Sequence, residues 1–101
     1  MESVRCDVVR WVADNPRPGW VEAHLTDAKG RRWLFFEKPS IFGTGLDRSS
    51  HFPVPAAIPC EVVSDGGELE AGLVEIRLLD GVQAQDGTVR FLVRADQVDR
   101  G

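Results

Sequence analysis

The sequence lacks most of the features from which a location or a chemistry is usually inferred. Its 101 residues contain two cysteines, one methionine and no tyrosine. No apolar run approaches the roughly 18 residues that a membrane-spanning helix needs. The first residues, MESVRCDVVRW, are charged from the second position and lack the apolar core of a signal peptide. These absences predict a cytoplasmic protein that does not associate with membranes and keeps its thiols reduced.

Catalytic and metal-binding signatures are also missing. Residues 47–51, DRSSH, hold a carboxylate, two hydroxyls and an imidazole. Catalytic triads, however, are assembled in three dimensions, and adjacent residues rarely supply that geometry. Cys6, Cys60, His24 and His51 lack the close pairwise spacing of structural zinc sites. We therefore expect no enzymatic activity, no metal and no cofactor.

The composition describes one folded domain over residues 1–101. Hydrophobic residues make up 43% of the chain and charged residues 28%, which is typical of a globular protein. The formal net charge is -4. That balance disfavours non-specific binding to nucleic acid, so a nucleic-acid partner is not expected. A cluster of Glu61, Asp65, Glu68, Glu70 and Glu75 predicts an acidic surface, which a basic partner protein could meet.

Glycine and proline divide the chain into short segments rich in Val, Ile, Leu and aromatic residues, which is typical of an all-β domain. Residues 68–79 are the best helical candidate, but they contain Gly72 and fit strand alternation better. We predict an antiparallel meander of six strands that closes into a small, partly open barrel, with a two-sheet sandwich as the alternative. The strands are expected over residues 4–12, 20–26, 31–38, 58–63, 72–79 and 88–95.

Two further features stand out from this pattern. Cys6 and Cys60 alternate with apolar neighbours and are predicted to be buried. Residues 39–57 form a long segment without strand periodicity, which is uncommon in a compact domain. This segment carries Phe42 and Phe52 among other apolar side chains, so it is expected to dock on the barrel or to bind something.

The turn between the second and third strands predicts how these strands pair. Residues 26–31, TDAKGR, place Asp and Gly where a type I turn with a following G1 bulge favours them. If Asp27 lies opposite Arg31, then Leu25 lies opposite Trp33 and Ala23 opposite Phe35. A loop longer by one residue would shift the pairing by one and exchange the two faces of the hairpin.

With the first register, Trp20, His24, Leu34 and Phe36 share the outer face of the barrel, and Trp20, Leu34 and Phe36 form an apolar patch there. Apolar patches on a protein exterior often mark binding sites. Phe42 or Phe52 could fold back over this patch. The candidate binding residues are therefore Trp20, His24, Leu34, Phe36, Phe42 and Phe52.

These observations predict a non-catalytic interaction module that binds a protein partner, or a second copy of itself, through this patch. The alternative is a small-ligand or single-stranded nucleic-acid binder that uses the same patch and the basic residues at its rim. Lys29, Arg31, Arg32 and Lys38 form that rim. An enzyme working from the segment 39–57 is the third and weakest reading.

Overall fold

The computed structural model describes residues 1–43, 45–64 and 69–101. Its elements are strands, with two short 3-10 helices, and no helix in these ranges is longer than four residues. In chain order they are β1 (Glu2–Ala13), β2 (Trp20–Thr26), β3 (Arg32–Glu37), η1 (Pro39–Phe42), β4 (Val54–Ser64), β5 (Leu73–Leu78), β6 (Arg90–Arg94), η2 (Ala95–Gln97) and β7 (Val98–Asp99).

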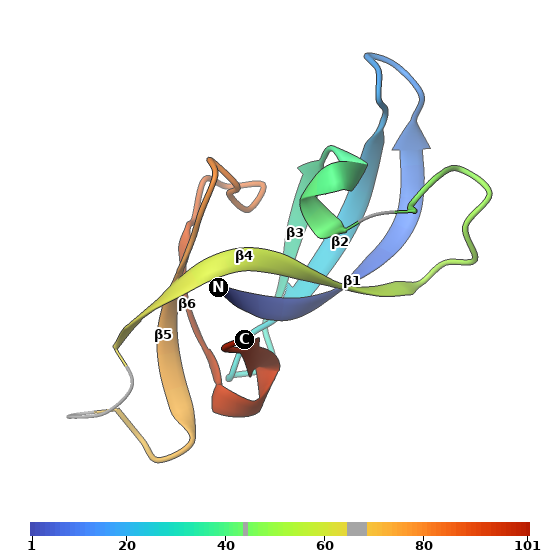
Figure 1. The fold of residues 1–101 in the computed structure, drawn as a ribbon. Helices are drawn as coiled ribbons and strands as arrows, with labels where there is room; N and C mark the ends of the chain where they lie inside the picture. Colours follow the sequence, from blue (N-terminus) through green and yellow to red (C-terminus); the bar gives the residue numbers. More distant parts are fainter. Residues whose placement is uncertain (44, 65–68) are drawn as a thin grey trace.

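The strands form one antiparallel sheet in the order β3-β2-β1-β4-β5-β6, with the short β7 added beside β1. Figure 1 shows the long β1–β4 pair in the middle, with β2 and β3 on one side and β5 and β6 on the other. The sheet curls into an open half-barrel, so the predicted all-β, partly open barrel is confirmed. Neighbouring strands are consecutive within each half, but β4 pairs with β1 and not with β3. The structure also adds a seventh strand to the six expected.

The curvature has a local cause in the two central strands. The pairing of β1 with β2 shifts between Val8 and Arg10 and again between Trp11 and Ala13. The pairing of β4 with β5 shifts between Val62 and Ser64. Such bulges bend a strand and increase its twist. β1 and β4 can therefore each belong to both halves of the sheet.

The concave side of the sheet holds the core. Phe35, Leu25 and Ile58 are fully buried, and burial of a side chain of this size contributes about 1.5–3 kcal/mol to stability. Phe91 links the two halves, because its ring lies 5.0 Å from that of Trp33 in an edge-to-face contact and 6.0 Å from that of Phe35. The other buried core residues come from β1, β2, β4, β5 and β6, from Phe42 in η1 and from residues 82–84.

Two strands at the ends of the sheet, β3 and β6, approach each other without forming a ladder. The N–H of Ala28 donates to the carbonyl of Leu92 at 2.9 Å, and the N–H of Gln85 donates to the carbonyl of Leu34 at 2.8 Å. We call this boundary the seam. Near it, the side-chain amide of Gln97 in η2 donates to the carbonyl of Thr26 at 2.8 Å. The barrel is thus fastened along the seam by isolated hydrogen bonds.

The segment 39–57 is more ordered than the sequence predicts. It begins with η1, and β4 starts at Val54 instead of at residue 58. Pro59 belongs to the strand predicted over residues 58–63, whereas Pro55 belongs to the segment predicted to lack strand periodicity, and both lie within β4. The carbonyl of Pro59 points away from β1, because it accepts from the N–H of Leu79 at 3.1 Å. Pro55 lies an even number of residues from Pro59, so its backbone groups also point away from β1. Neither proline therefore removes a hydrogen bond to β1.

Both cysteines are free and buried, so the predicted burial is confirmed. Cys6 lies on the inner row of β1 with Val4 and Val8, and Cys60 faces the core from β4. Burial, with a smaller contribution from Asp7, raises the pKa of Cys6 to about 12. Burial, with a smaller contribution from Glu2, raises the pKa of Cys60 to about 11. Both thiols are therefore neutral and shielded at physiological pH.

Candidate functional site: the outer face of the β2–β3 hairpin

The turn at Asp27 sets the two faces of this hairpin. The N–H of Asp27 donates to the carbonyl of Arg31 at 2.9 Å, and Gly30 takes a φ of 85°, as the predicted bulge requires. Leu25 consequently pairs with Trp33, and Ala23 pairs with Phe35. The predicted register is confirmed, and Phe35 is fully buried. The alternative register, with Leu34 and Phe36 inside, is wrong.

The outer face of the hairpin carries Trp20, Leu34 and Phe36, which we call the outer patch. Each of the three residues is half-buried. Glu22 lies opposite Phe36, and His24 lies opposite Leu34, so two polar residues run alongside the apolar ones. The structure therefore brings together four of the predicted binding residues, including His24, on one surface.

The polar centre of this face is Glu22, which is only 8% exposed. Its Oε1 accepts from Arg10 Nε at 2.7 Å, and its Oε2 lies 2.6 Å from His24 Nε2. The hydrogen bond with His24 is the largest influence and lowers the pKa of Glu22; burial opposes it, and Arg10 adds to the lowering. A buried carboxylate needs such partners, so this cluster holds the centre of the face in one arrangement.

Phe42 and Phe52 occupy different positions from the other four predicted residues. Phe42, at the end of η1, is 5% exposed and belongs to the core cluster. Phe52 is half-buried and packs against the same cluster. Phe42 therefore offers almost no surface to a ligand, and its role is structural. Through these two side chains the segment 39–57 packs against the core cluster, whereas the sequence predicted that Phe42 or Phe52 would fold back over the outer patch.

Trp33 lies on the inner row of β3 but reaches the edge of the barrel. Its indole Nε1 donates to Asp27 Oδ2 at 2.9 Å, and the guanidinium of Arg31 lies over its ring at 3.8 Å from the centroid. Beside it, a hollow of about 280 Å³ opens at the seam, between residues 31–34 and residues 84–86. The sequence contained the basic rim of this hollow, but gave no signal that residues 84–86 would form its other wall.

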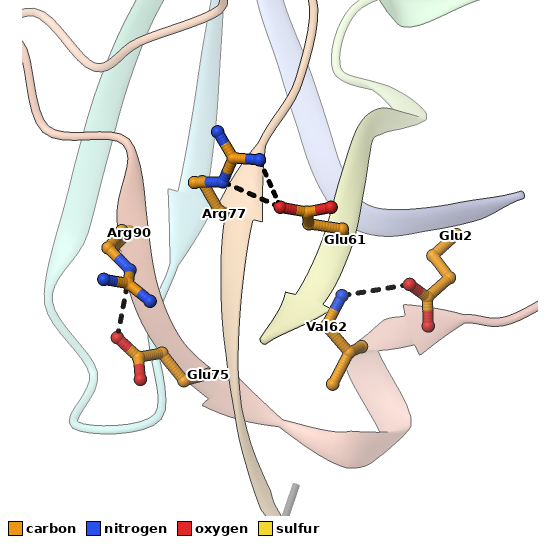
Figure 2. A network of polar contacts seen from close by, with 6 residues as sticks. All are labelled: Glu2, Glu61, Val62, Glu75, Arg77 and Arg90. Atoms are coloured by element: carbon orange, nitrogen blue, oxygen red, sulfur yellow. Dashed lines mark hydrogen bonds and ion pairs between the residues drawn. The ribbon is translucent and has the colours of Figure 1, made fainter. Parts of the chain in front are cut away.

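The opposite half of the barrel exterior has a different character. Figure 2 shows that its side chains form ion pairs between neighbouring strands. Arg77 donates from Nε to Glu61 at 2.8 Å, and Arg90 Nε lies 3.4 Å from Glu75. Two members of the predicted acidic cluster are thus paired with arginines, whereas Asp65 and Glu68 lie outside the described residues.

The polar segment 47–51 forms a turn. Asp47 Oδ1 accepts from the N–H of Ser49 at 2.8 Å and also from its hydroxyl, and the N–H of Asp47 donates to Ser50 Oγ at 3.1 Å. His51 is exposed. These side chains serve the local backbone, as turn residues commonly do. Within the described ranges, no three His, Cys, Asp or Glu residues gather in a way that could hold a metal ion.

Comparisons with protein-family models, with curated proteins and with solved structures find no match to this chain. In the part of the chain that the structure describes, no helix is long and apolar enough to cross a membrane.

Proposed function

We propose that this protein is a non-catalytic interaction module that binds a protein partner, or a second copy of itself, through the outer patch. The observation that carries the proposal is the position of Trp20, Leu34 and Phe36 on the exterior of the barrel. A side chain on the exterior of a sheet does not need to be aromatic for the fold to form. An apolar surface at such a position favours association with another molecule.

The contrast between the two halves of the exterior supports this choice of surface. Across β4, β5 and β6, the outward side chains include paired charges such as Glu61 and Arg77. That composition suits contact with water. On the outer face of the β2–β3 hairpin, apolar side chains flank the Glu22 cluster, and Arg32 lies at one end of this face. Association there would combine apolar burial with hydrogen-bonding groups of fixed orientation, a common composition for an interface centre.

The substitution that tests the patch is Phe36→Lys. A carboxylate at this position would face Glu22 across the strands and repel it, whereas lysine would face it favourably. We expect Phe36→Lys to unfold cooperatively in urea, like the unmodified protein. It should lose the partner captured from native cells, or it should lose self-association measured by sedimentation velocity.

The matched control is Val63→Lys, because Val63 is an apolar strand residue, 36% exposed, on the opposite half of the exterior. This variant should keep the partner or the oligomeric state. If Phe36→Lys binds as well as Val63→Lys, the outer patch is not the interface. If Phe36→Lys does not fold, Phe36 serves the core and the candidate site is wrong.

A cytoplasmic location remains part of this proposal. Two free cysteines in a small domain suit a reducing compartment, where disulfides seldom form. A tagged copy found in the cytoplasmic fraction, with both thiols reduced, would support it. Recovery from the cell exterior would refute it.

A further inference from the structure

Two arginines at the hollow of the seam form no ion pair or side-chain hydrogen bond among those of the described residues. Most guanidinium groups of the described residues donate to a carboxylate or a carbonyl, or lie close to a carboxylate. The exceptions are Arg17, Arg31 and Arg32, for which the hydrogen bonds and ion pairs of residues 1–43, 45–64 and 69–101 give no side-chain partner. Two of these three line the same hollow. The paired arginines are Arg5, Arg10, Arg48, Arg77, Arg90, Arg94 and Arg100.

Arg31 is held in place although it forms no ion pair. Its guanidinium lies over the ring of Trp33, and Trp33 is itself fixed by Phe91 and by the hydrogen bond to Asp27. Stacking occupies the flat face of a guanidinium and leaves its N–H edges free to donate. The protein therefore presents an oriented set of N–H donors, whose positive charge also acts on the carboxylates of Asp27 and Asp86.

The rest of the hollow defines what would accept from these donors. Leu34 and Trp33 line the hollow as apolar residues, and Arg32 lines it as a second basic residue. Asp86 lines the other side, but its Oδ1 accepts from the N–H of Thr88 at 3.0 Å. Neither arginine is within ion-pair distance of Asp86 among the described ion pairs. The volume of about 280 Å³ suits one small organic group.

We propose that this hollow binds an organic oxyanion, a carboxylate or a phosphate monoester joined to a small apolar group. The oxyanion accepts from Arg31 and Arg32, which recognise either geometry with two donors each. The apolar group lies against Leu34 and the exposed edge of Trp33. This site adjoins the proposed protein interface, because Leu34 belongs to both. It gives the small-ligand alternative a defined position and a defined chemistry.

The test is a titration followed by nuclear magnetic resonance, with the indole N–H of Trp33 as the reporter. Phenyl phosphate and benzoate are the two probes, and inorganic phosphate and benzyl alcohol each represent one half of the ligand. We expect a saturable shift with at least one probe and weaker binding of both halves. The stronger probe then identifies the source of the oxyanion as a phosphate ester or a carboxylate.

Variants assign the binding to the arginines. Arg31→Gln and Arg32→Gln should each weaken binding roughly tenfold, as loss of a charge-assisted hydrogen bond does. Arg17→Gln is the matched control, because it removes the same charge from an exposed, unpaired arginine elsewhere, and its affinity should be unchanged. Asp86→Asn should tighten binding, because it removes the only carboxylate lining the described hollow.

Two results would overturn the proposal. The first is no saturable shift with either probe in the folded protein. The second is an affinity that falls equally in Arg32→Gln and in Arg17→Gln, which would reveal attraction to net charge alone. Neither result bears on the outer patch, because Phe36→Lys leaves both arginines in place.

Discussion

The indole N–H of Trp33 donates to Asp27 Oδ2 at 2.9 Å. The side chain of Asp27 therefore links the hairpin turn to a residue of the barrel. The other oxygen of Asp27 accepts from the backbone N–H of Lys29 at 2.9 Å and of Arg31 at 3.0 Å. Partial burial acts to raise the pKa of Asp27, but these three hydrogen bonds outweigh it and the pKa is lowered. Asp27 thereby ties the hairpin turn to the packing that sets the register.

Replacing this carboxylate should destabilise the whole fold. Asp27→Ala removes three acceptor contacts at once and leaves the indole N–H of Trp33 without its partner. We expect the free energy of unfolding to fall by about 2 kcal/mol, measured by urea denaturation at neutral pH. Asp47→Ala is the control, because Asp47 also accepts from the backbone of its own turn, and the side-chain hydrogen bonds described above join it to Ser49 and Ser50 of that turn. Equal losses in the two variants would show that the contact with Trp33 contributes nothing.

Gly19 is a second position where a small change should have a large effect. Its φ is 106°, and a Cβ there would lie 2.4 Å from Cζ2 of Trp11. Gly19→Ala therefore combines backbone strain with a displaced aromatic ring, and should cost about 2 kcal/mol or more in unfolding free energy. Gly30→Ala is the comparison, because Gly30 has φ 85° but no heavy atom within 4 Å of the added Cβ. Thermal unfolding should separate the two variants, and a milder effect at Gly19 than at Gly30 would contradict the close contact with Trp11.

The cysteines should react only when the protein opens. Each thiol is buried and has a raised pKa, so the thiolate that attacks a disulfide reagent is scarce in the native state at pH 8. We expect labelling by an aromatic disulfide to be slow in buffer and complete within the dead time in denaturant. Rapid labelling of either cysteine under native conditions would show that the sheet around β1 and β4 is more open than described.

The carboxylate of Glu22 should make the free energy of unfolding depend on pH. Because its pKa is lower in the folded state, its contribution to stability is present above the ordinary glutamate value of about 4.3 and is lost as the pH falls through the folded value. Glu22→Gln should therefore be less stable than the unmodified protein at pH 7, and the difference should shrink by pH 3. Glu61→Gln is the control, since exposed pairs such as Glu61–Arg77 contribute little. A difference for Glu22→Gln that does not change with pH would contradict the proposed network.

The sequence predicts the hairpin well because its information is local. Asp27 and Gly30 define the turn, and period-two alternation then assigns Phe35 inward and Phe36 outward without any knowledge of the rest of the chain. Burial of Cys6 and Cys60 follows from the same alternation.

What the sequence does not provide is contact between distant segments. The pairing of β1 with β4 depends on which strands meet when the sheet curls, and the strand predicted over residues 58–63 did not extend back to the start of β4 at Val54. The Arg10–Glu22 contact depends on bulges in β1 that shift its register. The wall of the hollow at residues 84–86 belongs to a connection whose path no alternation pattern specifies.

Hydrogen exchange at the seam can report local opening of the half-barrel. The amides of Ala28 and Gln85 are each held by a single hydrogen bond, whereas the amides of the β1–β4 pair belong to a continuous ladder. Local opening releases isolated bonds at a lower free energy than unfolding releases a ladder. The difference in deuterium-exchange rate between these two amides and the amides of β1 therefore reports opening of the half-barrel along the seam while the sheet itself stays intact.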